Sequence, residues 1–448
     1  MNDKRIVLHA DLNSFFAMAE QQANPLLRKK PVGVVKAKGR TCIIAASVEA
    51  KKYGVATGCH ASDAKKLCPD IILVPADFAK YEDISRRFIK ICADYSPLCE
   101  VFSLDECFID VTETEKFWSI LPDNISAFHL AWVELAKVWG LSLGTINIVF
   151  DIKRRLREEI GDYMTCSIGI SYNRILAKLA SGRIKKDGLF WITEDNTLNV
   201  LDKSSLMDVC GLGYGLYNHL IKLDIDNFVK LRACSFSFLH KHFGPYWSVH
   251  LYNICRGVDN TPVLPHQDLA DAKSVGRTYT THRPLNNKKD VYQLTRNLAE
   301  EAAFKARTMG LVGRYVGFCL RTSPRNWSGP KDEGAISWWG HRTLKNYIDD
   351  GKALFDICEI ISREWQVKDV IFCGVTLAML TNKDYLTSPL FAEDRRREDL
   401  VKSADTVNEK YGDYTVFPAQ LLGIPIVRPE VTGYFGDKKF RLNFLQEN

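Results

Sequence analysis

The chain lacks the long apolar run that a membrane-spanning helix needs. No stretch of its 448 residues approaches the roughly 20 consecutive apolar residues that cross a bilayer. The N-terminal sequence MNDKRIVLHADLNSFF has charged residues followed by a short apolar stretch, which is not the pattern of a signal peptide. The sequence therefore predicts a cytoplasmic protein with no membrane partner.

The thirteen cysteines lack the spacing of a metal site. They are scattered singly from Cys42 to Cys373, and no CxxC pair or Cys/His cluster at zinc spacing occurs. Reduced thiols packed inside an intracellular protein are the simplest interpretation. The sequence also has no internal repeat and no low-complexity tract, which excludes a repeat architecture.

Neither sign of charge dominates the composition. Lysine and arginine number 60 and aspartate and glutamate 54, a formal net charge of +6. This mild basic excess permits a polyanionic partner without requiring one, because many enzymes that bind no nucleic acid carry a similar charge. With 46% hydrophobic and 25% charged residues, the chain is typical of a globular protein, and its length suggests about two to four domains.

Strand-like and helix-like patterns follow one another along the chain. Strands are predicted at 6–10, 31–35, 41–46 and 165–171, and helices at 15–22, 48–53, 61–68, 78–94, 126–139, 147–160 and 173–183. Short helices are predicted from 197 to 255, and the polar, Pro-containing residues 256–272 are typical of a linker. Strand-like runs at 273–281, 314–322 and 370–380 with helical stretches at 290–308 and 350–365 predict a separate α+β domain.

Three carboxylates mark the ends of predicted strands. The first strand ends at Asp11, and the β-rich runs 99–104 and 107–112 flank Asp105 and Glu106 as a hairpin with an acidic tip. If this hairpin lies beside the first strand, the three acids converge at one sheet edge. Like charges held that close raise each other's pKa unless cations neutralise them. Two Mg²⁺ ions roughly 4 Å apart suit such a site, although the same Asp-Glu pair is also compatible with an ordinary polar turn.

Three linked motifs give these acids a context. D-x-N-x-F-F-A at 11–17, S-L-D-E-C-F-I-D at 103–110 and I-G-I-S-x-N-x-x-L-A-K at 168–178 resemble the Y-family of DNA polymerases in content, order and spacing. The resemblance implies a multidomain α+β fold shaped like a right hand. It implies a ferredoxin-like palm at 1–18 and 78–168, small fingers at 19–77, a helical thumb at 169–256, a linker at 257–272, a little finger at 273–424 and a tail at 425–448.

The resemblance also implies an activity, namely low-fidelity, template-directed DNA synthesis past lesions with release of pyrophosphate. It assigns the binding of two Mg²⁺ ions to Asp11, Asp105 and Glu106, with the backbone carbonyl of Leu12 as a further ligand. The implied substrates are primer–template DNA and dNTPs. A sliding clamp, a UmuD-like accessory protein and a recombinase filament are further candidate partners.

Two aromatic residues and one lysine are expected to contact the nucleotide. Phe16 aligns with the family's steric gate, the ring that leaves no room for a ribose 2′-hydroxyl. Its neighbour Phe15 is expected to be a core aromatic beside the nucleotide, although the pattern alone is compatible with two core rings. Lys178 aligns with a family lysine that contacts the triphosphate.

The fingers segment departs from the commonest family pattern. Ala45, Val48 and Lys51 occupy positions where members often carry Thr, Tyr and Arg, so Lys51 is the one of these three that is expected to grip the triphosphate, as a point charge. The run C-I-I-A-x-x-x-E-A-K-K-x-G at 42–54 is similar to the UmuC branch, the catalytic subunit of DNA polymerase V. This similarity suggests an enzyme that depends on helper proteins.

Several further residues are candidate DNA contacts. V-C-G-L-G-Y at 209–214 resembles a helix-hairpin-helix, in which Gly211 and Gly213 would let backbone amides approach a phosphate. In the C-terminal region the candidate phosphate contacts are Lys273, Arg277, Arg314 and Arg321. Each of these residues is equally compatible with an ordinary turn or a surface charge.

Two other functions remain open from the sequence. One is a polymerase-derived scaffold that binds DNA or repair proteins and catalyses little, which the substitutions Ala45 and Val48 favour. The other is a different two-metal enzyme on the same palm, such as a nucleotide cyclase. The hairpin-helix pattern and the added C-terminal domain argue against the second.

Overall fold

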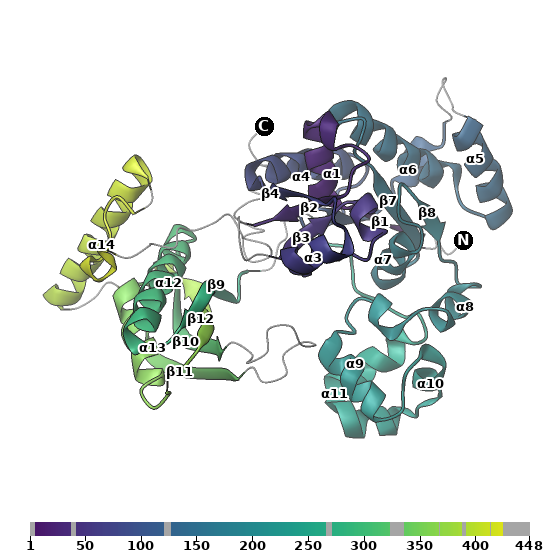
Figure 1. Cartoon of the computed structure of the whole chain (residues 1–448). Coiled ribbons are helices and arrows are strands. Elements are labelled where there is room, and N and C mark those ends of the chain that lie inside the picture. Colours follow the sequence, from purple (N-terminus) through teal and green to yellow (C-terminus); the bar gives the residue numbers. More distant parts are fainter. Residues whose placement is uncertain are drawn as a thin grey trace. The chain divides into compact units, whose positions relative to one another are not determined.

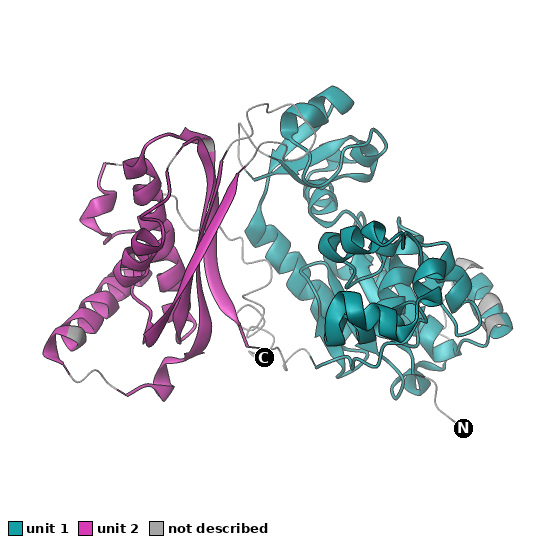
Figure 2. Ribbon diagram, turned by 90° about the horizontal axis from the view of Figure 1, so that it is seen from below, with its two compact units in different colours: residues 1–269, 442–448 teal, residues 270–441 magenta. Residues whose placement is uncertain are grey.

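The chain forms two compact units. The computed structural model describes residues 5–36, 42–120, 127–265, 271–322, 336–366, 368–387, 391–412 and 414–423. The boundary between the units lies between residues 269 and 270 (Figure 2). Among the described helices, none combines the length and the apolar content needed to span a bilayer.

A five-stranded sheet forms the centre of the first unit (Figure 1). In order across the sheet its strands are β5 (Cys99–Val101), β6 (Glu106–Asp110), β1 (Val7–Leu12), β7 (Cys166–Ser171) and β8 (Leu189–Trp191). β1 is antiparallel to both of its neighbours, whereas β7 and β8 are parallel. The hairpin predicted around Asp105-Glu106 is therefore present and lies beside the first strand.

Alternation along β1 separates the two faces of this sheet. Leu8, Ala10 and Leu12 belong to the main core, which also contains residues of α1 (Phe15–Ala23), α4 (Phe78–Ala93) and α6 (Leu143–Arg155). Val7 and His9 face the other way, toward α7 (Arg174–Arg183). Because successive side chains of a strand point to opposite faces, Asp11 lies on the α7 face as well.

Helix α7 packs unusually close to this second face. The side-chain oxygen of its N-cap residue, Asn173, accepts a hydrogen bond from the backbone amide of Leu176 at 3.0 Å. The side-chain nitrogen of Asn173 donates to the carbonyl of Gly257 at 2.8 Å. On β7, a Cβ at Gly169 would lie 2.1 Å from the carbonyl oxygen of Ala177 and 2.3 Å from another backbone nitrogen of α7. Only glycine therefore permits this helix–strand distance.

A second, three-stranded sheet lies in the segment predicted as fingers. Its strands are β3 (Ile43–Ala46), β2 (Val32–Val35) and β4 (Ile72–Pro75), and it packs with α2 (Val48–Lys51) and α3 (Ala61–Leu67) around a small core. Ser47 fixes the start of α2, because its hydroxyl accepts from the amides of Ala50 and Val32 and donates to the carbonyl of Lys30.

The remaining α-helices of the first unit range from six to nineteen residues in length. They are α5 (Ala127–Trp139), α8 (Thr197–Asp202), α9 (Tyr214–Lys222), α10 (Phe228–Ala233) and α11 (Phe236–Ile254). The last four share a core with Leu176 and Leu179 of α7. The segment predicted as a linker begins on this unit, since Val263 is buried and the carbonyl of Thr261 accepts from Arg5 at 3.0 Å.

The second unit is a four-stranded antiparallel sheet with helices on one face (Figure 2). Across the sheet its strands are β11 (Ser337–Ile348), β10 (Leu311–Thr322), β12 (Val370–Asn382) and β9 (Ser274–Leu285). Its helices are α12 (Lys288–Thr308), α13 (Gly351–Ile361) and α14 (Ala392–Tyr411). The alternating apolar residues Val316, Phe318 and Leu320 pack into a core with α12 and α13.

Most predicted elements are present, and the three strands that were not predicted share a common cause. The strands β4, β8 and β11 were not predicted, and α6 begins at Leu143 instead of residue 147. β4 and β8 are only four and three residues long, and most of β11 is exposed at a sheet edge. Short or edge strands leave little apolar periodicity in a sequence. The tail after residue 424 lies outside the described residues.

The close approach of α7 predicts a sharp difference between two glycines. Gly169→Ala should lower the free energy of unfolding by about 1–3 kcal/mol, because the new methyl group overlaps the helix backbone. Gly182→Ala, on α7 itself, meets no atom within 4 Å and should leave stability unchanged or raise it by up to ~1 kcal/mol. Urea-induced unfolding measures both variants. An equal loss of unfolding free energy in the two variants would contradict the close packing of α7 against β7.

Candidate active site

Strand pairing brings the three predicted carboxylates to one end of the five-stranded sheet. Asp11 on β1 lies opposite Glu106, the first residue of β6. The amide of Leu12 donates to the carbonyl of Asp105 at 2.8 Å, so the preceding acid lies beside the end of β1. The side chain of Leu12 is buried in the main core, and the role of its carbonyl as a metal ligand stays a prediction.

The environment of Asp105 is that of a crowded acid. Its Oδ1 accepts a hydrogen bond from the hydroxyl of Ser103 at 2.5 Å. Burial raises the pKa of Asp105, and the neighbouring charges of Asp11 and Glu106 raise it further, against the effect of that hydrogen bond. A nearby cation would reverse this effect, because it favours the ionised carboxylate.

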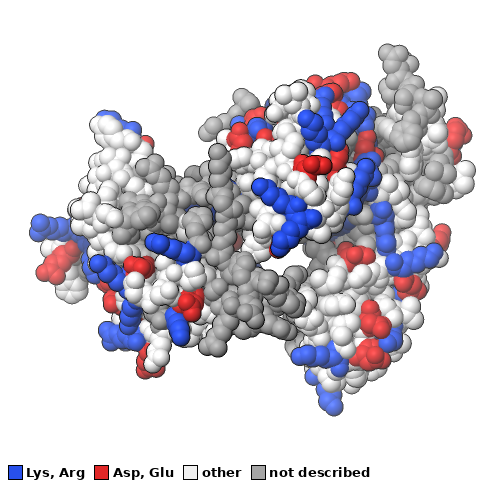
Figure 3. All heavy atoms as spheres, in the orientation of Figure 1, with Lys and Arg blue, Asp and Glu red and all other residues white. Residues whose placement is uncertain are grey.

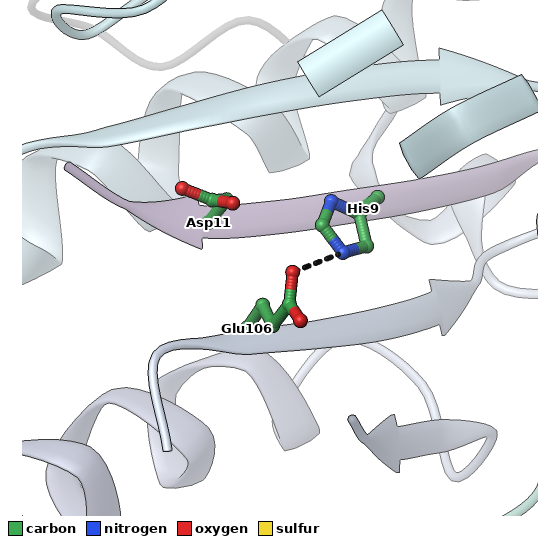
Figure 4. Close-up of side chains that lie close together, drawn as sticks. All are labelled: His9, Asp11 and Glu106. Atoms are coloured by element: carbon green, nitrogen blue, oxygen red, sulfur yellow. Dashed lines mark ion pairs between the residues drawn. The ribbon is translucent and has the colours of Figure 1, made fainter. Parts of the chain in front are cut away.

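Two basic side chains compensate the charge of Glu106, and Figure 4 shows one of them, His9. Its Oε2 lies 3.2 Å from Nε2 of His9 and is also paired with Nζ of Lys178. Although burial alone opposes ionisation, the contact with His9 and the charge of Lys178 lower the pKa of Glu106 to about 2. This carboxylate is therefore ionised at neutral pH.

His9 was not predicted as a site residue. It is fully buried, its Nδ1 lies 2.7 Å from Oγ of Ser181 on α7, and its ring packs at 4.6 Å from Phe108. Burial lowers the pKa of His9, against the influence of Glu106. The available signal was its spacing: His9 is two residues before Asp11 in a strand, and two residues of that spacing share a face.

Three lysines surround the acids, and one of them was also missed. Nζ of Lys185 lies 2.9 Å from Oδ1 of Asp11. Lys51 donates to the hydroxyl of Ser14 at 2.8 Å, and burial together with the charge of Lys185 lowers its pKa, partly offset by Asp11. With Lys178 these side chains form what we call the lysine cluster: Lys51, Lys178 and Lys185.

Buried polar contacts hold the loop that carries Lys185. The side-chain oxygen of Asn13, in the first motif, accepts from the amide of Asp187 at 2.7 Å. The buried ammonium of Lys153 donates to Oδ1 of Asp187 at 2.8 Å and to the carbonyl of Cys166 at 2.8 Å. Because a buried ammonium must be fully hydrogen-bonded, these contacts fix the loop beside Asp11.

The donor atoms at this edge suit a divalent cation. One ligand atom each from His9, Asp11 and Glu106 can be chosen so that all three lie within 4.8 Å of one another. Carboxylate oxygens are the ligands that hard divalent ions prefer. Asp105 does not belong to this group in the structure, since its carboxylate is turned toward Ser103. A cation bound here would compete with Lys178 and Lys185 for the carboxylates.

Phe15 and Phe16 are equally buried, each with 4% of its surface exposed. Burial alone therefore does not separate a core ring from a gate ring. The ring of Phe16 stacks on Tyr81 at 4.2 Å with an interplanar angle of 12°. The hydroxyl of Tyr81 in turn donates to the buried carboxylate of Glu20 at 2.6 Å. Phe16 is thus supported by an aromatic ring that is itself fixed.

The predicted hairpin-helix glycines have distinct backbone roles. Gly211 has a φ of 98°, in the left-handed region that favours glycine, and a Cβ there would lie 2.7 Å from Nε2 of His250. Gly213 is the N-cap of α9. Both conformations are compatible with a phosphate-binding turn, and the DNA contact stays a prediction.

The four basic candidates of the second unit have different surroundings. Lys273 is exposed. Nε of Arg277 lies 3.4 Å from the buried carboxylate of Glu301 on α12, so a phosphate contact would have to replace that pair. Arg314 lies over the ring of Tyr347 and Arg321 over that of Phe372, at 5.8 and 5.1 Å. Their contacts to DNA stay predictions.

Comparison with known proteins places this site in a family. The impB/mucB/samB family matches residues 10–182, and its C-terminal domain matches residues 272–388. A DNA polymerase IV of Bacteroides fragilis is 32% identical over 71% of this chain and 81% of its own length. A DNA polymerase IV of Moorella thermoacetica is 29% identical over 92% of this chain and 95% of its own length.

A solved structure supports the fold independently. A Y-family DNA polymerase chimera superposes with a TM-score of 0.64 at 22% identity, covering 84% of this chain and 98% of the chimera. The family match spans both units of the chain, and the motif carrying Asp11, the one carrying Asp105 and Glu106, and the one carrying Lys178 all lie inside residues 10–182. The chain belongs to the impB/mucB/samB family, that is, to the Y-family of DNA polymerases.

Proposed function

We propose that this chain is a DNA-directed DNA polymerase for translesion synthesis, which joins a dNTP to a primer 3′-hydroxyl and releases pyrophosphate. The observation that carries the proposal is the pairing of Asp11 with Glu106 across two strands, with Asp105 beside them. The relatives that match most of the chain are named DNA polymerase IV. Primer–template DNA and dNTPs are the substrates of such an enzyme.

Divalent cations are the cofactor that polymerases of this family use, and we propose Mg²⁺ held by Asp11, Asp105 and Glu106. When bound, two such ions stabilise the attacking and leaving oxygens of an in-line displacement at phosphorus. The protein's own part is to supply oxygen ligands in a fixed geometry and a cationic surface for the triphosphate. Asp105 faces Ser103 in the structure, so its carboxylate would have to turn toward Asp11 and Glu106 to share a cation with them.

The lysine cluster is the proposed triphosphate site. Lys178 and Lys185 are now paired with Glu106 and Asp11. If Asp11 and Glu106 held cations, the ammonium groups of Lys178 and Lys185 would be available to contact phosphate oxygens. Basic and acidic side chains are otherwise interspersed on the face drawn in Figure 3, so we assign nucleotide binding to this local cluster and not to a broad basic surface.

The small fingers are consistent with low fidelity. They consist of a three-stranded sheet with helices of four and seven residues, which offers little surface for testing the shape of a nascent base pair. We propose that a damaged template base is accommodated for this reason. The named relatives are of the DNA polymerase IV type, so the similarity of residues 42–54 to the UmuC branch remains a proposal based on sequence motifs.

A second candidate function is a catalytically weak scaffold. Ala45 and Val48 lack the hydrogen-bonding groups that many members carry at these positions, which favours an enzyme that needs an activating partner. A UmuD-like protein, a recombinase filament and a sliding clamp are the proposed activators. The tail that would dock on a clamp lies outside the described residues.

Primer extension tests the main proposal. The wild-type chain should extend a primer on undamaged and abasic templates with Mg²⁺. Asp105→Ala/Glu106→Ala removes the ligands of the ions and thereby several kcal/mol of transition-state stabilisation, which corresponds to a rate lower by roughly 10³-fold or more. DNA binding, measured by fluorescence anisotropy, should be retained by the double variant. Extension that survives in it would refute the assignment, and DNA binding without extension by either protein would favour the scaffold.

Sugar discrimination tests the gate. Phe16→Ala should let ribonucleotides enter, because the ring beneath the sugar is removed while Tyr81 still closes the core. Phe15→Ala is the matched control with equal burial and should leave the ratio of dNTP to rNTP insertion close to wild type. Single-nucleotide insertion kinetics measure that ratio, and an unchanged ratio for Phe16→Ala speaks against the gate.

Lysine substitution tests the triphosphate site. Lys185→Gln should raise KM for the dNTP, since a lost charge-assisted contact of about 1.5–3 kcal/mol corresponds to roughly a 10- to 150-fold effect. Lys186→Gln changes the adjacent lysine of the same loop and should leave KM near the wild-type value. Steady-state insertion kinetics at saturating DNA separate the two variants. Equal KM values for them would remove Lys185 from the nucleotide site.

A further inference from the structure

We propose that His9 is a positioning residue for Glu106, holding its Oε2 on the side of Asp11 where a divalent cation binds. The inference rests on the proposed function of the carboxylates and concerns a residue outside their ligand set. It follows from the burial of His9, from the groups that its two ring nitrogens face, and from the close packing of α7.

Nε2 of His9 has one acceptor within reach. The side chain is 0% exposed, so no water competes for this nitrogen. Within the described part of the chain it makes no hydrogen bond of good geometry, and its nearest acceptor is Oε2 of Glu106 at 3.2 Å. A buried polar atom without a partner is costly, and the ion-pair contact with Glu106 is what offsets that cost in the structure.

The contact with Glu106, and not Ser181 alone, determines which nitrogen carries the hydrogen. Nδ1 of His9 lies 2.7 Å from Oγ of Ser181, whose hydroxyl is also 2.9 Å from the carbonyl of Lys178. If the hydroxyl donates to Nδ1, the neutral ring carries its hydrogen on Nε2; if the hydroxyl donates to the carbonyl, Nδ1 is the donor, and Nε2 carries a hydrogen only in a charged ring. Because Oε2 of the ionised Glu106 lies 3.2 Å from Nε2, an arrangement with a hydrogen on Nε2 is favoured over two facing acceptors.

Packing of α7 builds this relay. His9 lies opposite Gly169 in the sheet register, and the missing Cβ of that glycine lets the backbone of α7 approach β7. The same turn of α7 carries Ser181 to the imidazole. The glycine of the third motif therefore determines the orientation of His9, and through it the orientation of Glu106.

His9 and Lys178 hold the same oxygen in different ways. The side chain of Lys178 is 25% exposed and flexible. Under the proposed function its ammonium group leaves Glu106 to contact a phosphate. His9 is fully buried and packs between Phe108 and Ser181. His9 is thus the contact that keeps the carboxylate in place when Lys178 leaves. Partners of ligating groups typically change metal affinity by about 10- to 100-fold.

A double-mutant cycle on Mn²⁺ binding tests this role without relying on turnover. Mn²⁺ is titrated into the full chain and free Mn²⁺ is measured by electron paramagnetic resonance for wild type, His9→Leu, Glu106→Gln and the double variant. His9→Leu should weaken binding by about 10- to 100-fold in the wild-type background. In the Glu106→Gln background the same change should alter the Mn²⁺ affinity by no more than about twofold, which is the deviation usually seen between sites that do not interact. Equal effects in both backgrounds, or none in either, would overturn the inference.

Two further variants separate positioning from folding and from direct ligation. His9→Asn keeps a polar group facing Ser181 but cannot reach Glu106, so it should lose affinity as His9→Leu does while unfolding near the wild-type temperature. His9→Gln restores a donor at the position of Nε2 and should recover most of the affinity. Failure of Gln to recover any affinity would contradict positioning by a donated hydrogen.

Primer extension by the same proteins separates this inference from the proposed function. A wild-type chain that extends primers and a Glu106→Gln variant that does not would support the polymerase assignment whatever His9 does. A wild-type chain that binds Mn²⁺ with the expected cycle but extends no primer would leave the role of His9 intact and remove the polymerase.

Discussion

The pairing of β1 with strands on both sides is the constraint on which the candidate site depends. Asp11 lies opposite Glu106 on one neighbour and opposite Ser167 on the other. Successive side chains of a strand point to opposite faces. A shift of the β1 register by one residue would therefore place Asp11 in the main core and turn Leu8 and Ala10 toward α7. Burying an unpaired carboxylate is far more costly than burying the apolar residues it would replace. Hydrophobic burial on one face of the sheet therefore enforces the position of the acids on the other.

A second constraint is the balance of charge at that edge. Burial, and then the charges of Asp11 and Glu106, raise the pKa of Asp105. The lysine cluster offsets the charge of the acids, with Lys178 and Lys185 in direct ion pairs. A substrate made of a polyphosphate and divalent cations brings charges of both signs in comparable number. Each protein group can then exchange one partner of opposite charge for another, instead of being left buried and unpaired, which is the expensive state for an ionic group.

Much of this arrangement could be predicted from the sequence, and the gaps have physical reasons. The apolar run before Asp11 and the two runs around Asp105-Glu106 carry a strong strand signal, so β1 and the hairpin were predicted with their acids. His9 reads as a core position, because its partner Ser181 is 172 residues away. The position of Lys185 depends on Asn13 and Lys153, whose contacts with Asp187 join distant parts of the chain. Long-range polar contacts of this kind leave no periodic trace, whereas local amphipathicity does.

The fingers show how such contacts shape the proposed chemistry. With Ala45 and Val48 unable to donate hydrogen bonds from their side chains, the groups left for a triphosphate are ammonium ions. An ammonium acts as a point charge, whereas the planar guanidinium of an arginine demands a bidentate geometry. Under the proposed function, the lysine cluster therefore attracts a triphosphate without fixing its pose closely. The alignment of the triphosphate would then depend on the cations and the carboxylates that hold them. For this reason the orientation of Glu106, and hence His9, matters more here than in a site that contains a bidentate arginine.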